Sequence, residues 1–190
     1  MNETVMRFKN KLKIREYAAG YQLYDLRHGK SKGRVWKSSV FFFIAMAMLF
    51  ILMMTGFNVA GYPVVTLMLM VCMYMCSYYV YMLPAIAKLK GEHIYKSSRL
   101  LSKEYFFEIK KDCFIMKNEH EYLKKYYSGL TDCIETDDIF MLAGGIDNTI
   151  IVISKRCLSG EENSELSAFF KREMVKQYRR ARGRKKGKKT

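Results

Sequence analysis

Charged residues are missing from one long stretch of this 190-residue chain: Ser38 to Ala87 contains no Asp, Glu, Lys or Arg, and no His either. Charged residues make up 27% of the whole chain, so their absence from this stretch does not follow from a low overall content of charge. An uncharged, apolar stretch of this length is too long for a buried core helix, and it begins too late and runs too long for a cleaved signal peptide. It is long enough for two membrane spans of roughly twenty residues each.

Patterns typical of catalysis and metal binding are missing as well. The five cysteines include no C-x-x-C pair and form no cluster with histidine at zinc spacing. His28, His93 and His120 have no Cys or carboxylate partner at a recognisable spacing, and no G-x-S-x-G or phosphate-loop pattern occurs. A stretch without intramembrane ionisable groups also argues against a transporter or pump that acts as a monomer. We therefore predict that the protein is not an enzyme and binds no metal and no cofactor.

The uncharged stretch divides into two apolar runs around a turn. Two glycines, an asparagine and a proline near its middle supply turn chemistry. Backbone polar groups in lipid must be satisfied within the segment, which predicts a helix on each side of the turn, about 40–58 and 64–84. Pro84 is expected to end or kink the second helix. The pattern predicts a transmembrane helical hairpin over 38–87.

Basic residues flank this hairpin on both sides. They are Lys30, Lys32, Arg34 and Lys37 before it, and Lys88, Lys90, Lys96 and Arg99 after it. Basic residues near the ends of a span are retained on the cytoplasmic side of the membrane. We therefore expect a two-span protein of the cell membrane with both termini in the cytoplasm.

Alternation of side-chain type marks the N-terminal segment. Every odd position of residues 7–15 is basic, and Phe8, Leu12 and Ile14 lie at even positions. This period of two predicts a half-buried strand, which is followed by a helical pattern up to Gly29. A basic, disordered or membrane-surface arm is the alternative interpretation.

After the hairpin, short strand-like segments alternate with polar or glycine-rich breaks. The segments are Tyr105–Lys110, Cys113–Lys117, Tyr122–Tyr127, Cys133–Thr136, Ile139–Ala143 and Thr149–Ile153. Ser159 and Glu162 then have the spacing of a helix capping box. Since both termini are placed in one compartment, the N-terminal strand is expected to join these segments in one cytosolic antiparallel sheet. A sheet followed by one C-terminal helix is the plan of a pleckstrin-homology-like (PH-like) module.

The order of these segments resembles the YcxB-like family of bacterial membrane proteins. The most telling run is CIETDDIFMLAGGIDNTIIVISKRCLSGEE, in which a short strand, an acidic turn, an aromatic strand and a further strand precede a helix. Ser154 and Asp112 depart from the Pro and Gly that the family tends to have at these places. The resemblance implies two transmembrane helices and a C-terminal YcxB-like, PH-like domain, and it implies no established enzymatic activity.

These expectations divide the chain into four parts. Residues 1–37 form a cytosolic strand and helix that pack on the C-terminal domain, and 38–87 form the transmembrane hairpin. Residues 88–176 form the YcxB-like cytosolic domain, and 177–190 form a basic, disordered tail. The predicted fold class is an α+β membrane protein whose two-helix hairpin is inserted into a PH-like antiparallel sheet domain with a C-terminal helix.

The tail is the most strongly basic segment, with nine basic and no acidic residues from Lys176 to Thr190. Clustered basic residues near a bilayer bind anionic headgroups, which makes these residues candidates for membrane-surface contact: Arg179, Arg180, Arg182, Arg184, Lys185 and Lys186. Nucleic acid is disfavoured as a partner of the tail because no aromatic residue follows Tyr178 to stack on bases. A solvated terminus without a specific partner is the other alternative.

Two classes of function fit these features. The first is a membrane-anchored scaffold or sensor whose cytosolic module binds a membrane or cytosolic protein, or the membrane surface. The second is an oligomeric pore-forming or transport-accessory subunit. A permeation path needs a polar or small-residue face, and the few such residues of the spans, among them Thr55, Thr66 and Ser77, lie mostly near the ends. This favours the first class, and homo-oligomerisation stays open.

Overall fold

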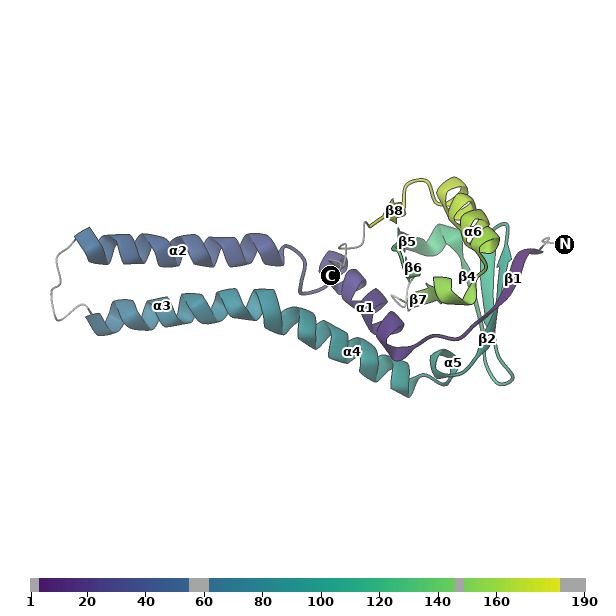
Figure 1. The fold of residues 1–190 in the computed structure, drawn as a ribbon, viewed down its shortest axis with the longest axis horizontal. Helices are drawn as coiled ribbons and strands as arrows, with labels where there is room; N and C mark the ends of the chain where they lie inside the picture. The colour runs from purple at the N-terminus through teal and green to yellow at the C-terminus, as the bar shows by residue number, and fades with distance from the viewer. Residues whose placement is uncertain (1–3, 55–61, 146–148, 182–190) are drawn as a thin grey trace, which may run out of the picture. The chain divides into compact units, whose positions relative to one another are not determined.

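The computed structural model describes residues 4–54, 62–145 and 149–181. The chain forms two compact units, one made of Met1–Tyr21 together with Lys90–Thr190 and the other of Gln22–Leu89. The first unit contains two four-stranded sheets with helices, and the second is built from apolar helices (Figure 1). The predicted α+β class is confirmed.

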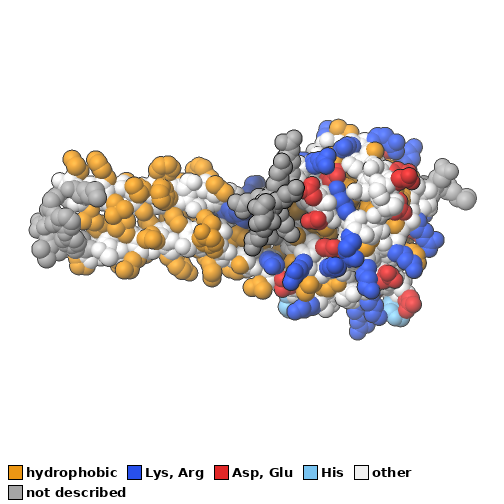
Figure 2. Space-filling view, viewed as in Figure 1, with side chains coloured by type: hydrophobic (Ala, Val, Ile, Leu, Met, Phe, Trp, Pro, Cys, Tyr) orange, Lys and Arg blue, Asp and Glu red, His pale blue; other side chains and the backbone are white. Residues whose placement is uncertain are grey.

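Two long apolar helices stand out in the fold. The first is α2 (Arg34–Met54), and the second runs through α3 (Tyr62–Ser77), a π-helical turn (Tyr78–Met82) and α4 (Leu83–Ser97). Each is long and apolar enough to cross a membrane, and only 6% of its most apolar stretch is buried. Figure 2 shows apolar side chains, in orange, along the surface of both helices. The prediction of two such helices is confirmed.

The second apolar helix does not end at Pro84 but continues to Ser97. Its irregularity lies just before the proline, where the backbone N–H of Leu83 bonds to the carbonyl of Tyr78 in a π-helical turn. Proline lacks an N–H, and its ring crowds the preceding turn of a helix. The wider π-turn accommodates the ring without breaking the helix. Of the two expected effects of Pro84, the helix end is wrong, and the helix instead becomes irregular just before the proline.

The first sheet is antiparallel, and its strand order follows the chain. It contains β1 (Thr4–Asn10), β2 (Tyr105–Lys110), β3 (Cys113–Lys117) and β4 (Tyr122–Tyr126). β1 pairs with β2, so the segments before and after the apolar helices lie side by side (Figure 1). The inward-facing side chain of Phe8 stacks on Phe107 with ring centroids 5.4 Å apart.

The N-terminal strand ends at Asn10, earlier than the alternation predicts. Beyond it the chain leaves the sheet, and α1 (Ile14–His28) begins. The Glu16 carboxylate accepts a hydrogen bond from the backbone N–H of Lys13 at 2.8 Å, which satisfies a donor at the start of the helix. Leu12 is still buried, but Ile14 belongs to the first helical turn and its assignment to the strand is wrong.

The second sheet corrects the prediction of a single sheet. It contains β5 (Leu130–Glu135), β6 (Ile139–Gly144), β7 (Thr149–Ser154) and β8 (Tyr178–Arg180) in the order β7-β6-β5-β8. β6 is buried along its whole length, which a single half-exposed sheet does not allow. The domain therefore divides its strands between two sheets that pack around a common core.

β8 lies within the segment that was expected to be a disordered tail. It pairs in parallel with β5, and its ends are held by hydrogen bonds from Cys133 N–H to the Gln177 carbonyl and from Ala181 N–H to the Glu135 carbonyl. β5 would otherwise expose an unpaired edge. The expectation of disorder is wrong for residues 178–180.

Helices complete the core on both faces of the second sheet. α1 lies against it at Gly20, whose Cα faces the side chains of Ile139, Met141 and Val152. On the other face, α6 (Gly160–Glu173) places Phe170 with its ring centroid 5.7 Å from that of Phe140. α6 begins with the predicted capping box, and the short helix α5 (Arg99–Ser102) leads into β2.

A buried asparagine joins the two sheets. Asn10, fully buried at the end of β1, donates from Nδ2 to the Tyr105 hydroxyl at 2.7 Å and to the Val152 carbonyl at 3.2 Å. Its Oδ1 accepts the backbone N–H of Ser154 at 3.2 Å. A buried amide is stable only when such partners are present, so this residue ties β1 to β7 with a defined register.

The contact at Gly20 predicts a measurable effect of one methyl group. The Gly20→Ala variant would place its Cβ 2.5 Å from Cγ2 of the buried Val152. We expect a loss of about 1–3 kcal/mol from overpacking, measured as a lower melting temperature of the full chain in a mild detergent, followed by circular dichroism.

Gly160 provides the matched control, because an added Cβ there meets no atom within 4 Å. Gly160→Ala should leave the melting temperature unchanged or raise it slightly, since alanine favours helices. Equal melting temperatures for Gly20→Ala and the unchanged chain would contradict the close packing of α1 on the second sheet.

Candidate functional site

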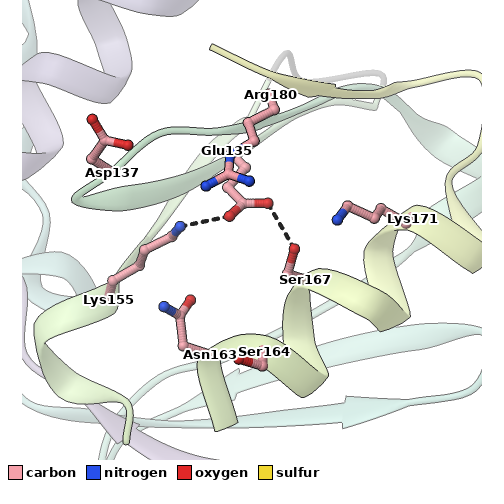
Figure 3. Close-up of a pocket in the computed structure, with 8 residues that line it drawn as sticks. All are labelled: Glu135, Asp137, Lys155, Asn163, Ser164, Ser167, Lys171 and Arg180. Atoms are coloured by element: carbon pink, nitrogen blue, oxygen red, sulfur yellow. Dashed lines mark hydrogen bonds and ion pairs between the residues drawn. The ribbon is translucent and has the colours of Figure 1, made fainter. Parts of the chain in front are cut away.

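A polar cleft of about 400 Å³ lies between α6 and one end of the second sheet (Figure 3). Its lining is almost entirely charged or hydrogen-bonding: Glu135, Asp137, Lys155, Asn163, Ser164, Ser167, Lys171 and Arg180. None of these residues belongs to the apolar helices. A cleft with this lining suits a ligand or a partner side chain that carries charge and hydrogen-bonding groups.

Four local structures place these side chains. Asn163, Ser164, Ser167 and Lys171 recur at helical spacing on one face of α6. Glu135 ends β5, and Asp137 lies in the turn that follows. The turn is closed by two hydrogen bonds: the Thr136 hydroxyl donates to the Ile139 carbonyl and accepts from the Ile139 backbone N–H. Lys155 opens a short 3₁₀ helix after β7, and Arg180 ends β8. The cleft therefore depends on β8 being in place.

Glu135 is the centre of the hydrogen bonding in the cleft. Its carboxylate pairs with Lys155 Nζ at 2.7 Å and accepts hydrogen bonds from Ser167 Oγ at 2.8 Å and from the Tyr178 hydroxyl. The Glu135 side chain is 5% exposed and that of Lys155 is 11% exposed. The pair is therefore shielded from water. Together with Ser167 and Tyr178, it joins four separate elements of the domain.

The surroundings of Glu135 keep its carboxylate ionised. Burial opposes ionisation, but the hydrogen bonds from Lys155, Tyr178 and Ser167 outweigh it and hold the pKa of Glu135 below its ordinary value. Burial and the hydrogen bond to Glu135 raise the pKa of Tyr178. A carboxylate saturated by three donors is not poised to transfer protons at neutral pH. The arrangement of Glu135 is suited to holding structure.

Other groups of the cleft remain available to a ligand. Lys171 and Arg180 are exposed, and Figure 3 shows both side chains directed toward the cleft. Within the described residues neither forms an ion pair with a carboxylate. Asn163 Oδ1 is buried and has no hydrogen-bond partner in the described part of the chain. Two cations beside an acceptor without a partner favour a ligand that combines an anionic group with a hydrogen-bond donor.

The predicted membrane-surface residues are only partly described. Arg179 and Arg180 are exposed in β8, where neighbouring side chains point to opposite sides of the strand, and only Arg180 lines the cleft. Arg182, Arg184, Lys185 and Lys186 lie outside the described residues. Among the residues that are described, no group of three His, Cys, Asp or Glu could hold a metal ion.

Sequence reasoning missed the cluster around Glu135. Its four members are far apart in the chain, at positions 135, 155, 167 and 178, and no spacing rule connects them. The one local signal was the pattern of polar residues on α6, at positions 163, 164, 167 and 171, next to the apolar face made by Leu166, Phe169 and Phe170.

Comparison with protein-family models, with curated proteins and with solved structures finds no match to this chain.

The Glu135 cluster predicts a destabilising and pH-dependent mutation. Glu135→Gln keeps the shape but leaves the buried Lys155 ammonium without a charged partner. We expect a loss of about 2–3 kcal/mol at neutral pH, which corresponds to a fall in melting temperature of about 4–12 °C. Thermal melts of the full chain in detergent, followed by circular dichroism, would measure it.

The pH dependence of the melting temperature shows whether the effect of Glu135→Gln comes from the lost charge or from a change in side-chain shape. The folded-state pKa is lower than the ordinary value of 4.5, so the carboxylate's contribution is complete above 4.5 and is lost as the pH falls through the folded-state pKa. The difference between the unchanged chain and Glu135→Gln should therefore shrink in acid. Glu165→Gln, at an exposed position on α6, should leave the melting temperature unchanged at both neutral and acidic pH. A difference at Glu135 that persists at low pH would contradict this explanation.

Proposed function

We propose that this protein is a membrane-anchored interaction or sensor module of the cell membrane, without enzymatic activity of its own. The observation that carries the proposal is the pairing of β1 with β2 across the two apolar helices. β1 precedes the helices and β2 follows them, so the domain is attached to the anchor at two points of the chain.

This pairing supports a specific topology. If α2 and the helix from α3 to α4 each cross the bilayer, the strands at their outer ends meet only when both flanks lie on the same side of the membrane. The basic residues that flank the helices favour the cytoplasmic side. We accordingly place the domain and both termini in the cytoplasm, and the turn between the helices outside.

The arrangement of the domain supports a PH-like fold and a relationship to the YcxB-like family. Two sheets of mainly consecutive strands enclose one core, and α6 packs against it after the last strand of the main meander. The described structure adds β8, which follows α6. In this proposal the apolar hairpin is an insertion between the first and second strands.

The cleft beside Glu135 is the proposed contact site for a protein partner or another ligand. Lys171, Arg180 and Asn163 Oδ1 would make the contacts, while Glu135 and Lys155 hold the site in shape. The basic residues of the tail, together with Arg179, would contact anionic headgroups, because each basic group near such a surface contributes about 1 kcal/mol.

The rival proposal of a pore-forming or transport-accessory subunit has less support. Between Ser38 and Ala87 the sequence offers no Asp, Glu, Lys, Arg or His to line a path. The buried positions of the two helices include Ala45 and Cys72, which are small and only weakly polar. Self-association of the helices remains compatible with both proposals.

The topology can be tested with two introduced cysteines. Asn58→Cys lies in the turn between the helices, and Lys185→Cys lies in the basic tail. In intact cells an impermeant maleimide should label the Asn58→Cys variant and should label the Lys185→Cys variant only after lysis. Replacing Cys157, the half-buried native cysteine of the domain, with serine reduces background labelling. Labelling of the Lys185→Cys variant in intact cells would reverse the proposed orientation.

A further inference from the structure

The outer face of the first sheet carries a surplus of positive charge. Side chains alternate between the two faces of a strand, and the residues opposite the core on β1 to β4 include five basic ones: Arg7, Lys9, Lys110, Lys117 and Lys124. Glu108 is the single acidic residue of this face on the four strands. We call this surface the outer face of the first sheet.

The single acid does not neutralise the face. Glu108 forms ion pairs with Arg7 at 3.3 Å and with Lys117 at 2.6 Å, so it is shared by two cations. Lys9, Lys110 and Lys124 form no ion pair with a carboxylate in the described residues. The face therefore carries more cations than carboxylates, and it is complementary to an anionic partner.

Aromatic residues alternate with these cations. The strand registers align Lys9, Phe106, Lys117 and Tyr122 in one row across all four strands. Neighbouring strands lie about 4.8 Å apart, so the row extends over roughly 14 Å. Tyr122 is 63% exposed. Tyr126, four residues further along β4 and on the same face, is 53% exposed. Large aromatic side chains with such exposure are surfaces that a flat ligand can cover.

A shallow hollow of about 540 Å³ opens over the Lys9, Phe106 and Lys117 part of this row. Four cations line it together with two carboxylates, one aromatic ring and two further polar side chains: Arg7, Lys9, Lys103, Lys117, Glu104, Glu119, Phe106, Asn118 and His120. Arg7 and Lys9 lie over the Phe106 ring, 5.0 Å and 5.3 Å from its centroid, and Lys124 lies 4.9 Å from the centroid of Tyr126. Cations and rings thus share the same small surface, with the charged groups outermost.

The occupant of this surface must offer negative charge and flat π surfaces at short intervals. An acidic polypeptide supplies the charge but no regular succession of rings. An anionic bilayer supplies phosphates, but Phe106 lies beneath two cations and cannot enter the acyl region. A single-stranded nucleic acid has both a phosphate and a base in every nucleotide. We infer that the outer face of the first sheet binds single-stranded nucleic acid.

This inference goes beyond the proposed function and uses different residues. No residue of the outer face lines the cleft at Glu135. The basic tail lacks aromatic residues after Tyr178, and the sheet supplies the stacking surface that the tail does not have. In this binding mode Tyr122 and Tyr126 stack on bases, and Lys9 and Lys124 contact phosphates.

The test measures binding of a labelled single-stranded RNA of about 12 nucleotides, a length within the usual range for such sites. The full chain is placed in nanodiscs of neutral lipid, and fluorescence anisotropy is recorded between about 50 and 200 mM salt. We expect the double variant Tyr122→Ala/Tyr126→Ala to weaken binding about tenfold to a hundredfold through lost stacking. Tyr122→Phe/Tyr126→Phe keeps both rings and should bind like the unchanged chain.

Charge variants provide an independent readout. Each of Lys9→Gln and Lys124→Gln should weaken binding and reduce the slope of log affinity against log salt by about 0.7, the value for one phosphate contact on a single strand. Lys13→Gln removes an exposed cation that lines neither the outer face nor the cleft and should change neither quantity. All these side chains are exposed, and circular dichroism would verify that the variants fold.

Three outcomes would overturn the inference. The first is RNA affinity that is unchanged in the tyrosine-to-alanine variant. The second is binding that disappears only when Arg182, Arg184, Lys185 and Lys186 are changed to glutamine, which would assign it to the tail. The third is that the outer-face variants lose binding to vesicles of anionic lipid while RNA binding is unaffected, which would identify the face as a membrane contact.

Discussion

The pairing of β1 with β2 joins two strands that the two apolar helices separate in the chain, and the rest of the domain depends on it. β1 alone has no neighbour in sequence with which to form a sheet, since α1 follows it directly. The hydrogen bonds of Asn10 then connect this pair to β7, because Oδ1 and Nδ2 bond to Ser154 and Val152. Satisfying one buried amide therefore fixes the position of the first sheet on the second.

A second buried polar cluster closes the opposite part of the domain. Glu135 holds the segment after α6 through Tyr178 and α6 itself through Ser167, while Lys155 balances its charge. Apolar packing of Phe140 and Phe170 brings α6 to the sheet, but such packing tolerates small displacements. The directional bonds of Glu135 remove that freedom. They define the shape of the cleft, and the exposed cations Lys171 and Arg180 are positioned as a result.

Features with a local signal could be predicted from the sequence. The apolar helices follow from one uncharged stretch, β1 from the alternation around Phe8, and the start of α6 from the capping box of Ser159 and Glu162. The division into two sheets has no such signal, because β3 of the first sheet is buried on both faces as β5, β6 and β7 are, so burial does not assign a strand to a sheet. The continuation of the helix past Pro84 depends on a π-turn that composition does not reveal.

The candidate site was the least predictable part. The basic tail was visible as composition, but β8 has only three residues and no periodicity, and it forms because β5 has a free edge. The Glu135 cluster arises from residues of four elements that only the folded chain brings together. Likewise, the row from Lys9 to Tyr122 exists only once four strands share one register.

The separation of β1 from β2 has a consequence for how the protein is made. During synthesis β1 emerges first and must wait for its partner while the chain grows by nearly a hundred residues, which takes on the order of 5–20 s at ribosomal speed. In the proposed topology both apolar helices must enter the bilayer during that interval. A hairpin with only one inserted helix would leave β1 and β2 in different compartments, with Met6 and Phe8 uncovered. Completion of the first sheet would thus report that membrane insertion has succeeded, and chains that fail would display the exposed apolar surface that chaperones and proteases recognise.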